Sequence, residues 1–583
     1  MNFWKAFFSS CLGAFTALVF FTILGIFLIV GIGAEELVEV KANSVLSLQL
    51  NYPISEQELE DPIADLFPEA ADKSMGLLQI KEAIAHASTD ENIKGIYLNS
   101  GFIGAGIASI DEIRNSLDDF RKSGKWVFAY SDYFSEGGYY LASVCDSIFL
   151  NPEGQVELNG LATEVTFYKK LFDKLEIRPQ VFRVGEFKSA VEPYLRDNLS
   201  EENRLQLNSL LNSIYNNMLS QVSAGRKIDP EKIKEIANKM LARNAKQAKE
   251  YSLVDDLFYE DQVMTYIKKR LGIEENEKIN LIKYQDYKDS YSDYTSSKNE
   301  IAVIVADGAI VPGRSDQGLV GAKTMVEALQ KARKSKKVKA VVLRINSPGG
   351  SAVASDAMWR EIMLTAKEKT VIASMSDYAA SGGYYLAMAC DTIVAKPTTV
   401  TGSIGVFLVI PDLSQFLGNK LGITSEEVKT GEIGELFTIT RALNETEKGI
   451  LQKQTDEVYE TFTAKAAQGR KMKIEDLKKI ASGRVWTGEQ GKENGLVDVL
   501  GGLDDAIDLA AKSAGVGKDY NLRYYPKPKS VFEKYFGSQE EEITEKKMRE
   551  SLGIENVLLF QQWKKVQQLQ GVQARMPFEF RIH

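Results

Sequence analysis

Two near-identical stretches of the chain differ at the residue that could act as a nucleophile. DYAASGGYYLAMACD occupies residues 377–391, and DYFSEGGYYLASVCD occupies residues 132–146. Ser381 of the downstream copy is replaced by Glu136 in the upstream copy. A serine followed by two glycines at the start of a helix can attack a carbonyl while backbone N–H groups hold the developing oxyanion. Serine is also a preferred helix N-cap, so this motif alone leaves both roles open.

A second candidate element is NSPGGS at residues 346–351, directly after the apolar run AVVLRI. Pro348 fixes a turn, and Gly349 and Gly350 can present their N–H groups in conformations that other residues avoid. These groups could form the other wall of an oxyanion hole and an edge that pairs with an extended peptide. A tight turn between a strand and a helix, without any catalytic role, is the alternative.

A serine nucleophile needs a base, and the chain contains only two histidines, His86 and His583. His86 lies in the helical pattern QIKEAIAHAS, and His583 is the last residue. This scarcity argues against a Ser-His-Asp or Cys-His enzyme and against a metal site with histidine ligands. We predict no metal and no cofactor. A lysine can replace histidine if burial lowers its pKa of about 10.4 by roughly three units.

The internal duplication singles out one lysine. VGEFKSAVEP at residues 184–193 carries Lys188, and the matching segment TGEIGEL at residues 430–436 has Gly434 in its place. The first unit therefore has the lysine without the serine, and the second has the serine without the lysine. Most lysines are solvated surface residues. Complementary loss is nevertheless expected when both units build one composite site, so we predict Lys188 as the base for Ser381.

The duplication extends well beyond these motifs and defines two units. Thirteen of twenty-two residues are identical between residues 131–152 and 376–397, at a constant offset of 245. The same offset aligns IKGIYLNS with VKAVVLRI. Each unit alternates apolar strands with amphipathic helices, which is typical of a parallel sheet covered on both faces. The predicted fold class is therefore α/β, with two tandem domains.

Changes of composition indicate the domain boundaries. The stretch between the units is polar and lacks Val, Ile and Leu, as expected for a linker. Towards the C-terminus a charged helical pattern precedes VLLFQQWKKVQQLQ, whose apolar face could pack on the core, on a partner subunit or on a membrane. We predict a membrane anchor at 1–40, a lysine-supplying domain at 41–283, a linker at 284–300, a serine-supplying domain at 301–520 and a helical tail at 521–583.

The N-terminus predicts a membrane anchor. Residues 6–34 contain no charged side chain, and LVFFTILGIFLIVGIG is long enough to span a bilayer. A cleaved secretory signal usually has a shorter apolar region, so an uncleaved anchor through residues 6–33 is favoured. Lys5 precedes the run, and Glu35 and Glu36 follow it. This charge bias places the N-terminus in the cytoplasm and the bulk of the chain outside it.

Charge argues against one class of partner, and the positions of two cysteines suggest their role. The net charge is −9 and no long basic block occurs, so a nucleic-acid partner is not expected. Cys145 and Cys390 occupy equivalent places in the two units. We interpret them as buried small apolar residues, with a disulfide between them as the alternative.

Together these motifs resemble the signal peptide peptidase A family in its long, duplicated form, also called protease IV. The resemblance covers about residues 40–520 and includes GRVWTGEQGKENGLVD at residues 483–498. It implies a Clp-protease and crotonase-like fold for both units, a homotetramer, and a Ser/Lys dyad. It also implies cleavage of remnant signal peptides at the cytoplasmic membrane, with the catalytic part on the periplasmic side.

The resemblance also implies roles for individual residues. Ser381 would be the nucleophile and Lys188 the general base. Backbone N–H groups of Gly382 and Gly350 would form the oxyanion hole. Ser403, in TGSIG, resembles the family hydroxyl that orients the lysine, although the sequence alone favours a loop serine that satisfies its own backbone.

Two other interpretations stay open at this point. A crotonase-like acyl-CoA hydratase or isomerase also holds an oxyanion with paired backbone N–H groups. It needs neither a serine-lysine pair split across a duplication nor a membrane anchor. The second alternative is a non-catalytic, membrane-tethered peptide-binding or assembly protein, in which Ser381 only caps a helix.

Overall fold

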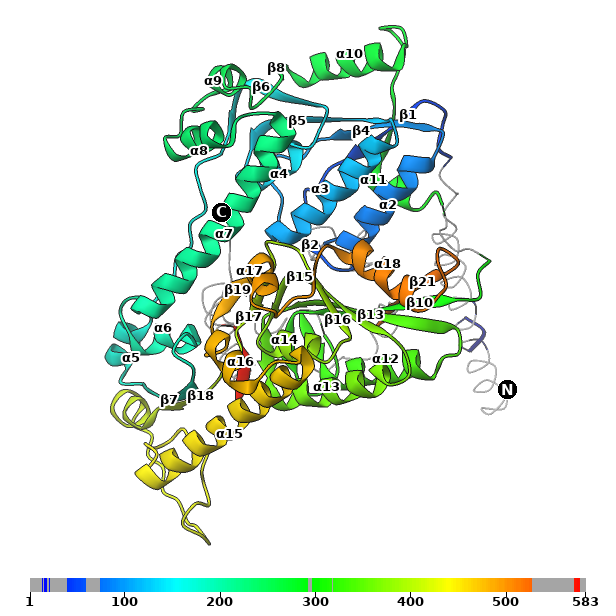
Figure 1. The fold of residues 1–583 in the computed structure, drawn as a ribbon. Helices are drawn as coiled ribbons and strands as arrows, with labels where there is room; N and C mark the ends of the chain where they lie inside the picture. Colours follow the sequence, from blue (N-terminus) through cyan, green and yellow to red (C-terminus); the bar gives the residue numbers. More distant parts are fainter. Residues whose placement is uncertain are drawn as a thin grey trace, which may run out of the picture.

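The computed structural model describes most of the two units and a short piece near the C-terminus (Figure 1). The predicted membrane anchor, with its bilayer segment 6–33, lies almost entirely outside the described residues. Within the described part of the chain, no helix is both long enough and apolar enough to cross a membrane. The described residues are Gly13, 15–17, Phe20, 39–58, 74–291, 296–316, 318–526 and 571–576.

A parallel six-stranded sheet forms the centre of the first unit. Its strand order is β8-β6-β5-β4-β1-β9, and every neighbouring pair is parallel. Most apolar residues of the central strands are buried, which agrees with the continuous apolar runs of the sequence. The strands are β1 (Ser44–Leu48), β4 (Ile93–Leu98), β5 (Trp126–Phe134), β6 (Ser147–Val156), β8 (Asp256–Leu257) and β9 (Asn280–Lys283).

Helices cover this sheet, and one of them extends beyond it. Helix α7 (Glu201–Arg226) begins near α6 and β7, beside the second unit, and runs along the side of the molecule to α4 and α8 of the first unit (Figure 1). Ser200 caps it by accepting a hydrogen bond from the Asn203 N–H. The other elements here are β2 (Ile54–Ser55), β3 (Met75–Gly76), α2 (Leu77–Thr89), α3 (Ile107–Lys122), α4 (Glu136–Ala142), α5 (Lys169–Leu175), η1 (Ser189–Val191), α6 (Glu192–Leu195), α8 (Pro230–Asn238), α9 (Ala245–Glu250) and α10 (Glu260–Leu271).

The second unit repeats this plan around an eight-stranded sheet. The order is β19-β17-β15-β13-β10-β21, with β16 beside β15 and β20 beside β16, and only the β17–β19 pair is antiparallel. The strands are β10 (Glu300–Asp307), β13 (Val338–Ser347), β15 (Val371–Ala380), β16 (Thr392–Ala395), β17 (Val400–Gly402), β19 (Val485–Thr487), β20 (Val499–Leu500) and β21 (Asn521–Tyr525).

The helices of the second unit alternate with its strands, as predicted. The predicted alternation of apolar strands and amphipathic helices is confirmed in this unit, where β10, α12, β13, α13, β15, α14 and β16 follow one another with only short strands between them. The helices are α12 (Ala322–Lys334), α13 (Ala352–Ala366), α14 (Gly382–Ala387), α15 (Glu445–Arg470), α16 (Ile474–Ile480), α17 (Gly488–Glu493) and α18 (Leu503–Ser513), with the π-helical turn η2 (Phe416–Leu421). The chain is therefore a mixed α/β protein with two tandem domains.

A third sheet joins the two units through main-chain hydrogen bonds. Its order is β12-β11-β14-β22-β18-β7. Strand β7 (Arg178–Val184) comes from the first unit and pairs antiparallel along its whole length with β18 (Val406–Asp412) of the second. The other members are β11 (Ala309–Val311), β12 (Leu319–Gly321), β14 (Gly349–Ser351) and β22 (Gln573–Arg575). This sheet brings segments that are distant in sequence to one edge of the second unit.

The predicted linker and the predicted tail both contain secondary structure that the sequence analysis did not predict. The linker 284–300 begins with helix α11 (Tyr284–Lys288), whose two tyrosines are buried in the core of the first unit. The tail predicted as helical from residue 521 begins instead with strand β21, because these residues extend the second sheet by pairing with β10. A second piece of the tail forms strand β22. Most of the tail lies outside the described residues.

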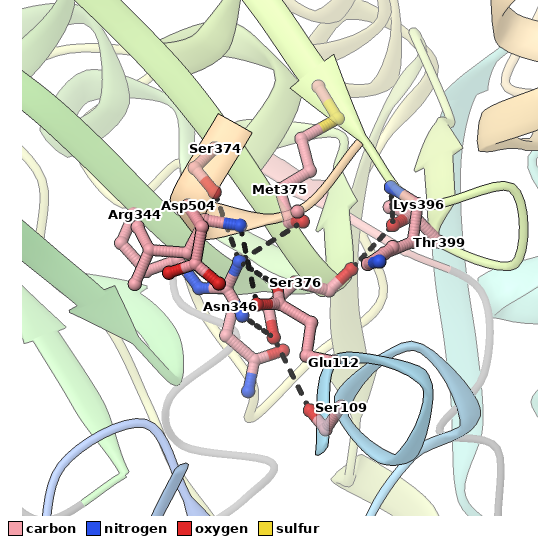
Figure 2. A network of polar contacts seen from close by, with 12 residues as sticks. Ser109, Glu112, Arg344, Asn346, Ser374, Met375, Ser376, Lys396, Thr399 and Asp504 are labelled. Carbon is pink, nitrogen blue, oxygen red and sulfur yellow. Dashed lines mark hydrogen bonds and ion pairs between the residues drawn. The ribbon is translucent and has the colours of Figure 1, made fainter. Parts of the chain in front are cut away.

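A buried ionic cluster also holds the units together (Figure 2). The Arg344 side chain is completely buried and donates hydrogen bonds to Glu112 Oε1 at 2.7 Å and Glu56 Oε2 at 2.8 Å, both from the first unit. Lys81 pairs with the same Glu112 carboxylate. Although burial opposes ionisation, the charges of Arg344 and Lys81 hold the pKa of Glu112 well below its usual range. Buried ion pairs therefore link the two units at this interface.

The two equivalent cysteines are buried and free. The interpretation as small apolar residues is confirmed for Cys145 and Cys390, and the alternative of a disulfide between them is wrong.

Candidate active site

Ser381 joins β15 to α14 in a conformation that is unusual for any residue except glycine. Its φ is 53° and its ψ is −110°, and the left-handed φ costs of order 1–3 kcal/mol. Its N–H donates to the Gly402 carbonyl at 2.8 Å. Although Ser381 occupies the N-cap position of α14, its side chain makes no cap hydrogen bond. The hydroxyl therefore lies free of the helix at a sharp turn between strand and helix.

Lys188 lies directly against this hydroxyl. The distance between Lys188 Nζ and Ser381 Oγ is 2.9 Å, although the residues are 193 positions apart in the chain. Lys188 Nζ also lies 3.0 Å from Ser403 Oγ and 3.1 Å from the Ser403 carbonyl oxygen. The structure thus brings together the three side chains that the sequence analysis singled out.

The surroundings of Lys188 favour a neutral amine. The side chain is completely buried, and this desolvation lowers the pKa of Lys188 well below its usual value. Its hydrogen-bond partners in the described part of the chain are uncharged oxygens, and no carboxylate there forms an ion pair with it. A neutral lysine can accept a proton, so Lys188 is the candidate base of this site.

Strand pairing between the units delivers Lys188 to the second unit. The chain leaves β7 at Val184, turns at Gly185 with a φ of 111°, and reaches Lys188 four residues after the strand. The Phe187 N–H donates to the Ser482 carbonyl of the second unit at 3.0 Å. The lysine is therefore held by main-chain contacts on both sides of the interface.

A glycine of the second unit makes room for the lysine backbone. A Cβ atom at Gly483 would lie 2.7 Å from both the backbone nitrogen and the Cβ of Lys188. Such contacts are too short for any side chain at this position, so the close approach of the two units requires glycine. Gly483 is the first residue of the GRVWTGEQGKENGLVD motif. The close approach of Lys188 therefore explains why this motif begins with glycine.

Ser403 has a geometry similar to that of Ser381. Its φ is 50°, and its N–H donates to the Arg484 carbonyl at 2.7 Å. Its hydroxyl lies at hydrogen-bond distance from Lys188, as the family resemblance implied. The sequence alone had favoured a serine that satisfies its own backbone, because a sequence does not show which distant side chain a loop will meet.

Two glycine-rich segments converge beside Ser381. Gly382 is the first residue of α14, where N–H groups lack partners within the helix. Gly349 has a φ of 95°, and a Cβ atom there would lie 2.6 Å from the Gly382 nitrogen. Gly350 follows in β14, so NSPGGS is both a tight turn and the start of a short strand beside the serine.

His86 does not contribute to this site. His86 Nδ1 lies 2.8 Å from the Tyr287 hydroxyl, and its ring stacks on Tyr291 with a centroid distance of 3.7 Å. His86 is therefore accounted for by packing within the first unit. His583 lies outside the described residues.

The sequence analysis missed one segment at the site. Residues 571–576 lie beside NSPGGS, where β22 pairs antiparallel with β14 and places Ala574 opposite Gly350. The signal in the sequence is weak: apolar Val572, Ala574 and Met576 alternate with two polar residues over only five positions. An alternation this short cannot be distinguished from chance.

Comparison with known proteins shows similarity over most of the chain. Residues 119–274 and 363–517 each match Peptidase family S49. Protease 4 of Salmonella typhi is 37% identical over 532 residues, which cover 88% of this chain and 85% of that protein. The chloroplastic serine protease SPPA of Arabidopsis thaliana is 37% identical over 485 residues, covering 82% and 70%. Protease 4 of Haemophilus influenzae is 34% identical over 472 residues, covering 79% and 76%.

Proposed function

Because this chain belongs to peptidase family S49 and is a serine peptidase, we propose that its catalytic pair is Ser381 and Lys188, divided between the two units. The observation that carries this proposal is the contact of 2.9 Å between Lys188 Nζ and Ser381 Oγ. The lysine is buried without a counter-charge in the described chain, and the serine hydroxyl is not used as a helix cap.

The proposed reaction begins with proton transfer between these two side chains. Neutral Lys188 accepts the hydroxyl proton as Ser381 Oγ attacks a peptide carbonyl carbon, and the protonated lysine then gives that proton to the departing amine. Water hydrolyses the resulting acyl-enzyme with Lys188 again as base. The hydroxyl and carbonyl oxygens of Ser403 accept hydrogen bonds from the lysine and keep Nζ directed at Ser381.

Backbone N–H groups would stabilise the oxyanion in this scheme. Gly382 stands at the N-terminus of α14, directly after the nucleophile, and Gly350 stands on the neighbouring strand β14. The close approach of Gly349 to Gly382 supports a joint role for the two segments. Backbone donors that are fixed by the fold stabilise a developing negative charge without reorganisation.

We extend the proposal to the setting of the enzyme. The substrates would be remnant signal peptides and other apolar peptides at the cytoplasmic membrane, with residues 6–33 as the anchor and the catalytic part on the periplasmic side. The uncharged apolar run and the charges that flank it support this topology. A homotetramer of crotonase-like domains completes the proposal. An anchored enzyme meets membrane-associated peptides at a raised local concentration.

The two competing interpretations have less support. A crotonase-like acyl-CoA hydratase would not need a serine and a neutral lysine in contact. A non-catalytic binding protein in which Ser381 caps α14 does not agree with a hydroxyl that makes no cap hydrogen bond. The relatives that match most of the chain are proteases by name.

Substitution of either member of the pair tests the proposal. We expect Ser381→Ala and Lys188→Met each to lower hydrolysis of an apolar fluorogenic peptide by about 10³-fold or more. Lys170→Met is the matched control, because the Lys170 side chain is 80% exposed. Covalent labelling of the parent, but not of Ser381→Ala, by a serine-directed acylating inhibitor would identify the nucleophile. Full activity in either variant would overturn the dyad.

A further inference from the structure

Helix α7 of the first unit carries a row of polar side chains that bind the second unit. Gln206, Ser209 and Ser213 follow one another at intervals of three and four residues, so they lie on one face of the helix. Ser209 Oγ accepts a hydrogen bond from Gln490 Nε2 at 3.0 Å, and Ser213 Oγ lies 2.8 Å from Thr487 Oγ1. Both partners belong to the GRVWTGEQGKENGLVD motif. This face of α7 therefore binds the motif whose first glycine makes room for the lysine.

Gln206 differs from the other two residues of this face because it also contacts the loop that carries Lys188. Its side chain is completely buried. Gln206 Nε2 donates to the Phe187 carbonyl oxygen at 3.1 Å and to Ser189 Oγ at 2.9 Å, and these are the residues directly before and after the lysine. Gln206 Oε1 accepts from the Val485 N–H at 3.3 Å. One amide thus joins the lysine loop of the first unit to β19 of the second.

Two backbone groups of opposite kind determine the orientation of this amide. The Phe187 carbonyl can only accept and the Val485 N–H can only donate, so the amide nitrogen faces the loop and the amide oxygen faces β19. Asn203 Oδ1 accepts from Ser189 Oγ at 2.9 Å and from Gln206 Nε2 at 3.0 Å. Removing one member of such a buried network leaves its partners desolvated without compensation. The network therefore holds the lysine loop in one position.

Strand β19 leads from this amide to the two serines of the site. Val485 lies opposite Gly402 in the β17–β19 pair, and the Gly402 carbonyl accepts from the Ser381 N–H at 2.8 Å. The preceding residue, Arg484, accepts from the Ser403 N–H at 2.7 Å through its carbonyl. The start of β19 thus supports both serines, and the buried amide of α7 ties it to the lysine loop.

We propose that Gln206 is a positioning residue of the peptidase, which sets the distance between Lys188 Nζ and Ser381 Oγ. This inference rests on the proposed function and deepens it, because the proposed base and nucleophile come from different units and meet only where the units are held in register. The amide is fully engaged with the protein, so Gln206 acts through the backbone on both sides and not on the substrate. A displacement of about 1 Å at a reacting group can lower a rate by about 100-fold.

The same contacts also keep the surroundings of Lys188 dry. Burial lowers the pKa of Lys188 well below its usual value. Without the Gln206 amide, the Phe187 carbonyl and the Val485 N–H would lose their partner and would recruit water to the interface beside the lysine. Hydration of the amine favours its protonated form. Loss of Gln206 should therefore raise the pH at which the enzyme becomes active.

The Gln206→Met variant tests this inference, because methionine has a similar length and lacks the amide. We expect kcat on an apolar fluorogenic peptide to fall by about 10- to 100-fold, with KM unchanged within about twofold. The acidic limb of the pH profile should move upwards by about one pH unit. Titration with a serine-directed acylating inhibitor counts the folded enzyme, so that a loss of folded protein is not mistaken for a loss of kcat. The parent's kcat and pH profile in this variant would overturn the inference.

Gln221→Met is the matched control on the same helix. Gln221 lies about four helical turns further along α7, where its Oε1 accepts from Arg114 Nη1 at 3.1 Å within the first unit. This substitution removes a glutamine hydrogen bond of the helix without touching the lysine loop, so kcat and the pH profile should match those of the parent. The same shift of the acidic limb in Gln221→Met would show a general loss of structure and would overturn the specific role of Gln206.

Gln206→Asn is a second variant that keeps the amide but shortens the side chain. Its amide cannot reach the Phe187 carbonyl and the Val485 N–H together, so kcat should fall by several-fold and the acidic limb should move in the same direction. Parent kinetics in this variant would overturn the inference even where Gln206→Met does not fold. If the Gln206 variants match the parent while Ser381→Ala and Lys188→Met are inactive, only the positioning role is wrong. Full activity in Ser381→Ala or Lys188→Met would overturn the proposed function as well.

Discussion

The two copies of one turn adopt different backbone conformations. At the start of α4, Ser135 has a φ of −65° and caps the helix by accepting from the Gly138 N–H, so Glu136 is the first helical residue. At the start of α14, Ser381 itself takes the cap position with a φ of 53°, and its hydroxyl makes no cap hydrogen bond. The first unit keeps the conformation that stabilises a helix. The second unit lacks this cap hydrogen bond, and the Ser381 hydroxyl contacts Lys188 instead.

The segments that correspond to Lys188 and Gly434 differ in the same way. Lys188 is buried against the second unit after β7 pairs with β18. Gly434 lies in an exposed turn that is closed by its own N–H and the Gly431 carbonyl. Glu136, at the position of the serine, is a buried carboxyl whose pKa is raised by burial to about 7. This difference between the copies supports the proposal that each of them supplies a different part of one site.

Exchange of the residues that distinguish the two turns is expected to have the largest effect. Ser381→Glu should lower peptide hydrolysis by about 10³-fold or more, because the nucleophile is lost. Glu136→Ser should leave the rate unchanged within about twofold, because no lysine is available at Gly434. Steady-state kinetics on an apolar peptide would measure both. New activity in the double variant Ser381→Ala, Glu136→Ser would contradict the division of roles.

The second largest effect is expected at the interface between the units. Arg344 corresponds to Asn99 of the first unit, which is not buried and approaches Glu260. Arg344→Met would leave Glu56 without its buried cation and should lower the free energy of unfolding by about 3–5 kcal/mol. Arg314→Met, which breaks an exposed pair with Glu327, should cost less than about 1 kcal/mol. Chemical denaturation would measure the free energy of unfolding of both variants. Equal losses in the two variants would contradict a stabilising role for the buried cluster.

The buried lysine predicts a characteristic dependence on pH. Burial lowers the pKa of Lys188 in the folded protein, so the unfolded chain binds a proton that the folded chain lacks. The free energy of unfolding should therefore rise with pH between the folded and unfolded pKa values, and that contribution is lost as pH falls through the folded value. Peptide hydrolysis should fall with pH in the same way, because protonated Lys188 is no base.

Lys188→Met separates this contribution from the rest of the protein. The variant should be at least as stable as the parent. The difference in their free energies of unfolding should grow as pH decreases from the unfolded to the folded pKa of Lys188. Thermal unfolding of both proteins from weakly acidic to alkaline pH would measure the difference. A difference in stability between parent and variant that does not change with pH would contradict a neutral Lys188.

The smallest effects are expected from the helix caps themselves. Ser135→Ala should lower the free energy of unfolding by about 1 kcal/mol, because it removes a cap hydrogen bond. Ser381→Ala removes no cap and should have a smaller effect, while Ser381→Gly should stabilise the protein by up to about 1 kcal/mol by relieving the positive φ. Denaturation midpoints would rank the three variants. A larger loss at Ser381 than at Ser135 would contradict the assignment of the two conformations.

The sequence alone predicted much of the fold and the composition of the site. Apolar strands were predicted to alternate with amphipathic helices in each unit, and this alternation is confirmed in the second unit. The duplication directed attention to Ser381, because Glu136 stands in its place, and to Lys188, because Gly434 stands in its place. Patterns of this kind are visible because local periodicity and repeats are properties of the chain itself.

Only the tertiary structure decided where these residues meet. Ser381 and Lys188 are 193 positions apart, and their contact depends on β7 pairing with a strand of the other unit. The strand at Gln573–Arg575 was missed because three residues carry too little pattern, and its stability comes from two neighbouring strands distant in sequence. The sequence determined which residues could do chemistry. Long-range strand pairing and burial decided their distance, their protonation and which segment of the chain lies against them.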